Sequence, residues 1–433
     1  MRVLFTTYPE KTHFLAMAPL AWALRTAGHE VVFAVQPVFT DVITQAGLTA
    51  VPVGGERHLW QLMSRHMHWL PAGVGGLPVP YDAAEWHPGD VTWSYLKDGY
   101  ELQVSRWHKM SNVPIVADLV EFARSWKPDL VVWEPTTYAG AIAAEACGAA
   151  HARLLFSVDS LAVTRAHHLR LMERQPPGDR ADPLADWLGG YAHKYGFEFS
   201  EELVTGQFTI SLLPRSLRLE ADLRYVPMRY VPYSGAAVVP SWLREPPGRP
   251  RVALTMGLST ADHGAGYVVD LPDVLEALAD MDVELVATVS EAARDRLASI
   301  PDNARLVPFV PLDALAATCS AVIHHAGFGT LATTALHAVP HLVVPWDGDG
   351  PALGRRIAAQ GAGLALHPMQ ATGTTIRDRL LRLLNEPRFR HGAALLREEM
   401  LAMPTPNELA GDLEELAAAH RHAPLAGSAI GGG

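Results

Sequence analysis

The sequence predicts an α/β fold in which two doubly wound, Rossmann-like domains face each other across a deep cleft. Short apolar runs alternate with segments of helical periodicity in both halves of the chain, and a proline-rich stretch separates the two alternations. Glycines follow the first helical segments at the positions where helices end. With 433 residues, 49% of them hydrophobic, the chain can fill the cores of two such domains.

The first alternation occupies residues 1–213 and predicts an N-terminal domain. An aromatic-rich insertion at residues 60–110 interrupts this alternation of strands and helices. Because the joints between elements are short, the strands are expected to be parallel. The expected strands are Val3–Tyr8, Glu30–Val35, Thr49–Val53, Asp129–Trp133 and Ala152–Ser157, and the expected helices are Phe14–Ala27 and Pro37–Ala46.

A proline-rich segment at residues 214–250 is predicted to link the domains, because proline interrupts helices and sheet ladders. The second alternation occupies residues 251–403, a helix at 404–423 is expected to pack back on the N-terminal domain, and residues 424–433 form a flexible tail. The second domain's expected strands are Val252–Met256, Glu284–Thr288, Arg305–Pro308, Ala321–His324, His341–Val344 and Leu364–Leu366. Its expected helices are Leu271–Ala279, Leu312–Thr318, Thr330–Ala338, Pro351–Gln360 and Thr374–Asn385.

The overall charge narrows the function classes. Thirty-five basic against 46 acidic residues give a net charge of −11, which argues against a nucleic-acid partner and against anionic membrane surfaces. The sequence contains no apolar run long enough to cross a membrane and starts without a secretory signal pattern. Cys147 and Cys319 are too few for a disulfide framework or a zinc box. We therefore expect a cytoplasmic protein.

The strongest local signal is the segment Ser320–Thr330, which includes His325, Gly327 and Gly329. A strand ends there, two glycines allow a close backbone approach, and a helix is expected to begin at Thr330. Free amides at a helix N-terminus favour an anion, so this loop suits a diphosphate. Taken alone, an ordinary glycine turn with a threonine cap explains the pattern equally well.

A second glycine loop at Thr255–Thr260 follows the first strand of the second domain and is a weak signal. It matches neither the dinucleotide fingerprint nor a Walker loop. The turn Tyr8–His13 in the first domain also lacks the dinucleotide fingerprint. A nicotinamide-dependent dehydrogenase is therefore disfavoured.

Motifs along nearly the whole chain resemble the GT-B nucleotide-sugar glycosyltransferases. Within that fold, the chain is most similar to the actinobacterial natural-product enzymes that place TDP-deoxyaminosugars, such as desosamine and forosamine, on macrolides and related polyketides. The resemblance implies an inverting, metal-independent transferase with no cofactor and a TDP-sugar as co-substrate. The matching segments are Arg2–Phe5, His13, Pro19–Ala21, Ala27–Val31, Trp126–Pro135, Met228–Gly235, His325–Thr330, Val339–Pro340, Val344–Pro345, Asp349 and Gly361–Gly363.

The resemblance implies which residues bind the donor. The diphosphate would be held by the loop residues that match the family's motif, with help from Ser259. Phe309 and Val310 would flank the nucleobase, and Asp349 would hold the sugar. The implied diphosphate ligands are His325, Ala326, Gly327, Gly329 and Thr330, with Ala326 replacing the family's usual glycine or cysteine.

One departure from the family concerns the sugar itself. Many relatives have an amide residue after the aspartate, whereas this chain has Gly350. A donor that lacks hydroxyl groups needs fewer polar partners, so Gly350 favours a deoxygenated sugar, although a turn glycine is the alternative. Asp159 and Asp313 are further candidates for contacting donor or acceptor and for neutralising an aminosugar's ammonium group, with Asp313 also expected to cap a helix.

Sugar transfer to a hydroxyl group needs a general base, and histidine has a suitable pKa. His13 follows the first strand and matches the family's catalytic histidine. Glu134 follows the strand Asp129–Trp133 and matches the family's acidic partner, which would orient the imidazole and stabilise its charged form. A strand-end acid that only caps its neighbours is the alternative for Glu134.

Tryptophans concentrate in the insertion, where Trp69 and Trp93 are candidates for an apolar wall around a hydrophobic polyketide acceptor. Core filling beneath a long insertion explains them equally well. The resemblance also implies an activator protein similar to a haem-thiolate monooxygenase, docked on exposed parts of Trp60–Trp107 and Ala162–Glu173. A homodimer is compatible with the same resemblance.

Two other functions remain open on the same fold. A sugar-nucleotide epimerase or hydrolase would turn over the donor without an acceptor and would not need the aromatic wall. A non-catalytic auxiliary protein would not need His13, His325 and Asp349, which this chain retains.

Overall fold

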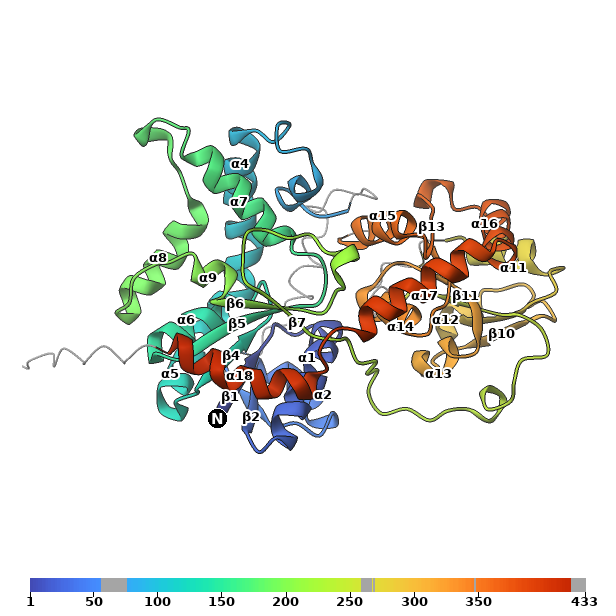
Figure 1. The fold of residues 1–433 in the computed structure, drawn as a ribbon, viewed down its shortest axis with the longest axis horizontal. Coiled ribbons are helices and arrows are strands. Elements are labelled where there is room, and N and C mark those ends of the chain that lie inside the picture. The colour runs from blue at the N-terminus through green and yellow to red at the C-terminus, as the bar shows by residue number, and fades with distance from the viewer. Residues whose placement is uncertain (56–75, 258–266, 268, 346–347, 422–433) are drawn as a thin grey trace, which may run out of the picture.

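The computed structural model describes residues 1–55, 76–257, 267, 269–345 and 348–421. It contains two parallel sheets, each wound with helices, that lie side by side (Figure 1). The predicted fold class is therefore confirmed. Among the earlier candidates, Ser259, Trp60, Trp69, part of the 60–110 insertion and the tail 424–433 lie outside the described residues.

The N-terminal sheet has seven strands in the order β3-β2-β1-β4-β5-β6-β7. Their bounds are β1 Arg2–Thr6, β2 Glu30–Val35, β3 Ala50–Pro52, β4 Leu130–Trp133, β5 Ala150–Leu155, β6 Phe208–Ser211 and β7 Tyr225–Pro227. The longer helices are α1 Lys11–Thr26, α2 Thr40–Gln45, α4 Trp93–Gln103, α5 Lys109–Trp126, α6 Ala139–Cys147, α7 Ser160–Met172 and α8 Pro183–Tyr195. Shorter elements are η1 Pro37–Phe39, η3 Tyr81–Glu85, a π-helical turn η4 Val104–His108, η5 Pro177–Asp179, α9 Glu202–Thr205, η6 Arg215–Leu217 and η7 Ser241–Leu243.

The C-terminal sheet has six strands in the order β10-β9-β8-β11-β12-β13. They are β8 Arg251–Thr255, β9 Glu284–Thr288, β10 Ala304–Val307, β11 Cys319–His324, β12 His341–Val343 and β13 Gly363–Ala365. The helices are α11 Leu271–Leu278, α12 Glu291–Arg294, α13 Leu312–Ala316, α14 Phe328–Leu336, α15 Gly350–Gln360, η8 Pro368–Gln370, α16 Gly373–Asn385, α17 Pro387–Leu401 and α18 Pro406–His420.

Several elements differ from the sequence-based expectation, and β6 was not expected at all. The expected helix at 37–46 is divided into η1 and α2. α14 begins at Phe328, so Thr330 lies inside its first turn and Gly327 takes the cap position. β7 lies within the proline-rich segment and pairs with β6. An edge strand tolerates Pro227 because one side of it needs no ladder hydrogen bond.

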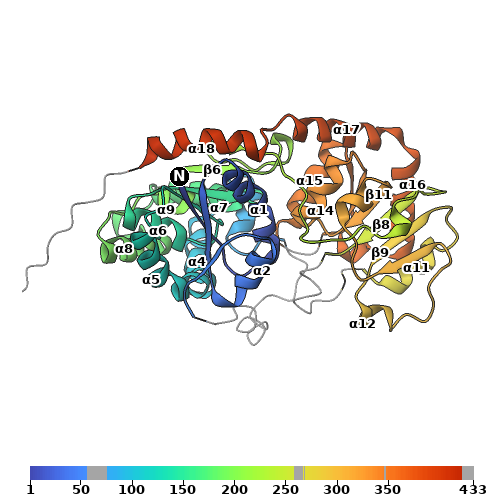
Figure 2. The same cartoon turned by 90° about the horizontal axis from the view of Figure 1, so that it is seen from below.

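The last helix, α18, crosses from the C-terminal domain and lies along the N-terminal one (Figure 2). It packs on α1, and the Gln207 Nε2 atom donates to the His420 carbonyl at 3.3 Å. Arg421 pairs with Asp129 at 2.8 Å. The chain thus links the two domains a second time, beyond the 214–250 segment.

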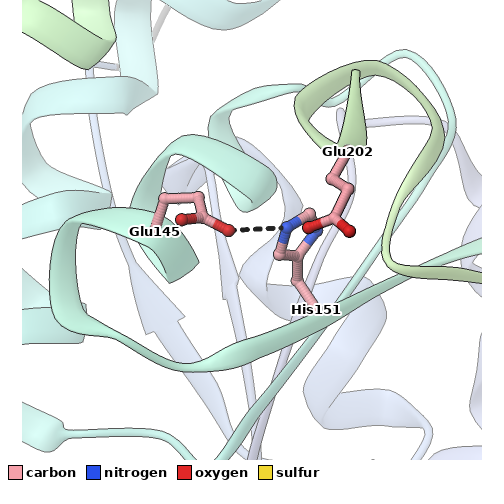
Figure 3. A group of neighbouring side chains, drawn as sticks. All are labelled: Glu145, His151 and Glu202. Atoms are coloured by element: carbon pink, nitrogen blue, oxygen red, sulfur yellow. Dashed lines mark hydrogen bonds and ion pairs between the residues drawn. The ribbon is translucent and has the colours of Figure 1, made fainter. Parts of the chain in front are cut away.

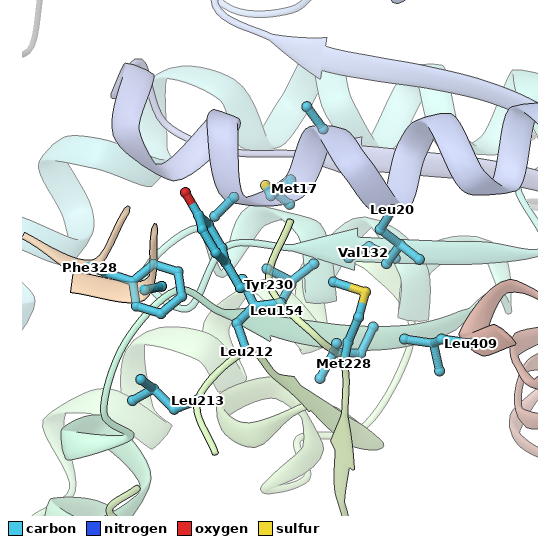
Figure 4. Packing of buried hydrophobic residues seen from close by; sticks show 14 of the residues in the cluster. Met17, Leu20, Val132, Leu154, Leu212, Leu213, Met228, Tyr230, Phe328 and Leu409 are labelled. Carbon is cyan, nitrogen blue, oxygen red and sulfur yellow. The ribbon is translucent and has the colours of Figure 1, made fainter. Parts of the chain in front are cut away.

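One hydrophobic cluster runs through both domains (Figure 4). Met17 and Leu20 of α1, Tyr230 of the linking segment, Phe328 of α14 and Leu409 of α18 all belong to it. Burying such a shared cluster opposes separation of the domains. Within the described part of the chain, no helix is both long and apolar enough to span a bilayer.

Candidate active site

A cavity of about 320 Å³ lies between the domains and is lined by residues of both. Its N-terminal wall follows β1 and β5, and its C-terminal wall includes the residues that follow β8 and β11. The strand order reverses between β1 and β4 in the first sheet and between β8 and β11 in the second, and ligands of open α/β sheets bind near such points. His13 and Glu134 come from the first sheet's edge, and Gly257 and His325 come from the second's.

His13 lies in the first turn of α1 and faces Glu134. Its Nδ1 atom is 3.4 Å from Glu134 Oε1, and the two side chains are 14% and 1% exposed. The other carboxylate oxygen, Oε2, accepts hydrogen bonds from the Thr136 backbone and from the hydroxyls of Thr136 and Thr137 at 2.8–3.0 Å. Three donors hold Oε2 in place, so Oε1 is left to face the imidazole.

Aromatic rings hold the His13 imidazole on two sides. Phe156 stacks on it with ring centroids 3.6 Å apart, and Tyr8 meets it edge-on at 5.0 Å. Trp107, from the π-helical turn η4, in turn meets Tyr8 edge-on at 5.8 Å. Burial and the negative charge of Glu134 raise the pKa of Tyr8, so its phenol stays neutral. Sequence reasoning missed Tyr8 and Phe156, although both closely follow a strand.

Asp349 lines the cavity from the C-terminal domain and approaches the N-terminal one. Burial raises the pKa of its carboxyl group, while the Ser157 hydroxyl and the His13 ring oppose that shift. Ser157 follows β5, directly after Phe156. Asp349 and the general-base candidate His13 therefore line the same cavity from opposite domains.

His325 lies between two glycines whose size the geometry requires. A Cβ atom on Gly257 would lie 2.4 Å from the His325 ring, and one on Gly327 would lie 2.5 Å from it. Gly257 also has a φ of +83°, which side chains rarely adopt. Burial lowers the pKa of His325 to about 4, so the imidazole is neutral near pH 7. Its Nδ1 atom has no hydrogen-bond partner among the described residues.

The loop beside His325 is held by a pair of buried histidines. The Ala326 N–H donates to His324 Nδ1 at 3.1 Å, and His324 Nε2 contacts His341 Nδ1 at 2.9 Å. Since His324 Nδ1 accepts, its Nε2 atom carries the proton and donates to His341. Ala326 has a φ of +70°, a conformation that costs energy for a residue with a side chain. The pair therefore stabilises a strained loop at the cavity wall.

The remaining donor-side candidates also line the cavity. Phe309 and Val310 precede α13, and Gly329 and Thr330 lie in the first turn of α14. Asp313 lines the cavity too, but its Oδ1 atom pairs with His337 at 2.8 Å and its side chain caps no helix. The expectation of a cap was wrong because Pro311 holds the cap position of α13.

Gly350 starts α15 and is buried. A Cβ atom there would lie 3.1 Å from the His325 carbonyl oxygen and 3.2 Å from Pro345. Close packing thus explains the glycine without reference to the sugar, and Gly350 carries no independent information on the donor.

Two candidates point away from the cavity. Asp159 is 1% exposed, and its oxygens accept from the Arg153 guanidinium at 3.1 and 2.7 Å and from Tyr225 at 2.9 Å. The idea that Asp159 reaches a sugar or an ammonium group was wrong, because Arg153 neutralises it inside the core. Trp93 is half-buried, packs its ring on His168 at 5.0 Å and is not among the residues that line the cavity.

A second cluster of possible ligand atoms lies outside the cleft, where Glu145, His151 and Glu202 approach one another (Figure 3). Trp133 Nε1 donates to His151 Nδ1 at 3.2 Å. The proton of the neutral ring is then on Nε2, which donates to Glu145 at 3.2 Å. Nε2 has no lone pair for a cation in that arrangement, so the cluster is best described as a hydrogen-bonded network around a neutral histidine.

Comparisons with known proteins agree with this geometry. Residues 22–257 match the family described as erythromycin biosynthesis protein CIII-like, N-terminal domain, and residues 272–416 match the C-terminal domain of the same family. The chain is 46% identical to 10-deoxymethynolide desosaminyltransferase of Streptomyces venezuelae over 98% of this chain and 99% of that protein.

Solved structures give the same result. Glycosyltransferase VinC in complex with dTDP is 40% identical, with a TM-score of 0.86 over 97% of this chain and 100% of VinC. Spinosyn forosaminyltransferase SpnP is 39% identical, with a TM-score of 0.81 over 96% of this chain and 99% of SpnP. The chain therefore belongs to the erythromycin biosynthesis protein CIII-like family of GT-B-fold glycosyltransferases.

Proposed function

We propose that this protein transfers a deoxyaminosugar from a TDP-sugar to a hydroxyl group of a hydrophobic polyketide or macrolide-type aglycone, with inversion at the anomeric carbon. The observation that carries the proposal is the cleft itself. It places the His13–Glu134 pair opposite Asp349 and beside the glycine loop at the start of α14. The relatives' names supply the sugar and acceptor classes.

The chemistry assigned to His13 follows from its contacts. Nδ1 faces Glu134, so Nε2 is the nitrogen that takes the proton from the acceptor hydroxyl. The acceptor oxygen then bonds to the anomeric carbon, the bond from that carbon to the phosphate oxygen breaks, and TDP leaves. Glu134 stabilises the imidazolium ion that results, and the stacked Phe156 ring fixes its plane.

The donor half of the proposal uses the C-terminal domain. The amides at the start of α14 and the His325 ring would stabilise the negative charge that grows on the leaving diphosphate. Phe309 and Val310 would flank the nucleobase, and Asp349 would hold the sugar. In this proposal the helix amides and the His325 ring balance the charge of the diphosphate, so the reaction would need no metal ion or further cofactor.

Two partner proposals accompany the reaction. An activator protein would dock on the N-terminal domain over Trp86, which is 37% exposed, and the outer face of α7. The second proposed partner is another copy of this chain, in a homodimer. Co-purification with a co-expressed activator tests the first, and the mass in solution tests the second.

The function is tested by two measurements on the purified chain. In a thermal-shift panel, TDP at 100 times its Kd should stabilise the protein by about 2.7 kcal/mol. A preference for UDP or GDP would contradict the deoxysugar assignment. Incubation with a TDP-deoxyaminosugar and a macrolactone should yield the glycoside by mass spectrometry. Donor turnover that is independent of acceptor would favour the epimerase or hydrolase alternative instead.

A further inference from the structure

An ion pair joins the two domains next to the catalytic cleft. Glu85 ends η3 in the N-terminal domain, and both of its carboxylate oxygens are paired with consecutive residues of α15. Oε1 accepts from Arg356 Nη1 at 2.8 Å, and Oε2 pairs with Arg355. The Glu85 and Arg356 side chains are only 18% and 20% exposed, whereas Arg355 is 60% exposed.

The helix that carries these arginines also carries the sugar-binding candidate. α15 begins at Gly350, directly after Asp349. A backbone hydrogen bond, from the Gly348 N–H to the Gly76 carbonyl at 3.0 Å, ties the same turn to the N-terminal domain. The start of α15 is therefore attached to the opposite domain before Asp349 and again one to two turns after it.

We infer that Glu85 is a positioning residue for the transfer reaction, which holds α15 so that Asp349 keeps its place on the cavity wall across from His13. This inference rests on the proposed function. TDP itself contacts only the C-terminal domain in that proposal, whereas the sugar lies between the domains. Loss of the Glu85 pair should therefore affect use of the sugar nucleotide and spare the binding of free TDP.

Buried or half-buried pairs of this kind couple by amounts that correspond to about 5- to 30-fold in an equilibrium constant. Glu85→Gln keeps the shape of the side chain and removes its charge. We expect kcat/KM for the TDP-sugar to fall by about 5- to 30-fold, mainly through KM, while the Kd of TDP measured by calorimetry changes by less than about twofold. Glu101→Gln, on the exposed face of α4, is the matched control and should behave as wild type.

A double-mutant cycle separates positioning from general damage. If Glu85 acts through Arg356, Glu85→Gln combined with Arg356→Gln should lose no more than the worse single variant. Fully additive losses, a wild-type kcat/KM in Glu85→Gln, or a parallel loss of TDP affinity would each overturn the inference.

Failure of the proposed function gives a different result. In that case the wild-type chain itself transfers no sugar, and small-angle X-ray scattering then tests only the structural premise that the Glu85 pair holds the domains together. Glu85→Gln should give a larger radius of gyration than Glu101→Gln if the pair holds the domains together. Equal radii would contradict it.

Discussion

His13 and His325 face the same cavity from opposite domains, yet their surroundings differ. His13 has a carboxylate 3.4 Å from Nδ1 and an aromatic ring stacked on its face. His325 lies between two glycines, no carboxylate among the described residues pairs with it, and burial lowers its pKa to about 4. A negative charge therefore faces the first imidazole, whereas burial keeps the second one neutral.

The position of a histidine at the edge of a sheet does not by itself determine its role. Both histidines follow a strand at the point where the strand order of their sheet reverses. The two histidines differ in their neighbours. The Glu134 carboxylate lies next to His13, whereas Gly257 has no side chain and so leaves room for the His325 ring. A proton acceptor needs the first kind of neighbour, whereas a neutral hydrogen-bond donor to a diphosphate needs the second.

The largest effect should come from removing the proton acceptor. His13→Ala should lower kcat by at least about 100-fold, because no other described side chain facing the cavity replaces the lost base beside Glu134. The Kd of TDP, measured by calorimetry, should stay within about twofold of wild type, since His13 lies in the other domain. Full activity in this variant would remove His13 as the base.

The next effect comes from neutralising the partner of His13. Glu134→Gln should lower kcat by about 10- to 100-fold, because the amide cannot stabilise the imidazolium ion. Thr137→Val, which removes one donor to Oε2, serves as a graded control and should cost less. If Glu134 only caps its neighbours, the two substitutions will reduce thermal stability and leave kcat per folded enzyme unchanged.

A smaller effect should come from filling the space around His325. Gly257→Ala places a Cβ atom 2.4 Å from the ring, so the ring must move and TDP should bind about 10-fold more weakly. Gly196→Ala is the matched control, because Gly196 has a similar φ of +84° but nothing within 4 Å of the added atom. Equal TDP affinities in the two variants would mean that His325 does not contact the diphosphate.

A separate effect concerns stability at mild acid and leaves the catalytic comparison untouched. Burial lowers the pKa of His341 to about 3 and that of its partner His324 well below its usual value, so both are neutral in the fold. The unfolded chain binds these protons near pH 6.5, so the free energy of unfolding falls as pH drops from there toward 4. For His341 the loss at pH 5 is about 2 kcal/mol.

Urea unfolding at pH 7 and pH 5 checks this loss. His341→Gln should reduce the difference between the two pH values, whereas His391→Gln, at an exposed position, should leave it unchanged. A His341→Gln variant with the same pH dependence as wild type would show that the buried pair does not resist protonation.

Much of the fold could be predicted from local patterns. The strands Glu30–Val35 and Glu284–Thr288 have the predicted bounds, because apolar runs between turn residues encode burial on both faces of a parallel sheet. β7 was missed, since three residues containing Pro227 have no periodicity that distinguishes an edge strand from a linker. The helix expected at 37–46 was divided because Pro37 starts a tighter turn.

The candidate site was less uniformly predictable. His13, Glu134, His325 and Asp349 all lie at the cavity or directly behind it, since parallel winding gathers the carboxyl ends of strands at one edge. Asp159, like Glu134, follows a strand of the first sheet, yet Arg153 holds it in the core. No local pattern separates these two acids, because their partners lie on different elements.

The sequence by itself determined the alternation of strands and helices, the two glycine loops, and the residue types at the strand ends, because each depends on neighbours a few positions away. Only the tertiary structure decided which groups face one another. It placed Asp349 and His13 on the walls of one cavity, paired Glu85 with Arg355 and Arg356 about 270 positions later, and enclosed His325 between Gly257 and Gly327. Such contacts depend on how two whole domains pack, and that packing is the sum of many weak interactions spread over the chain.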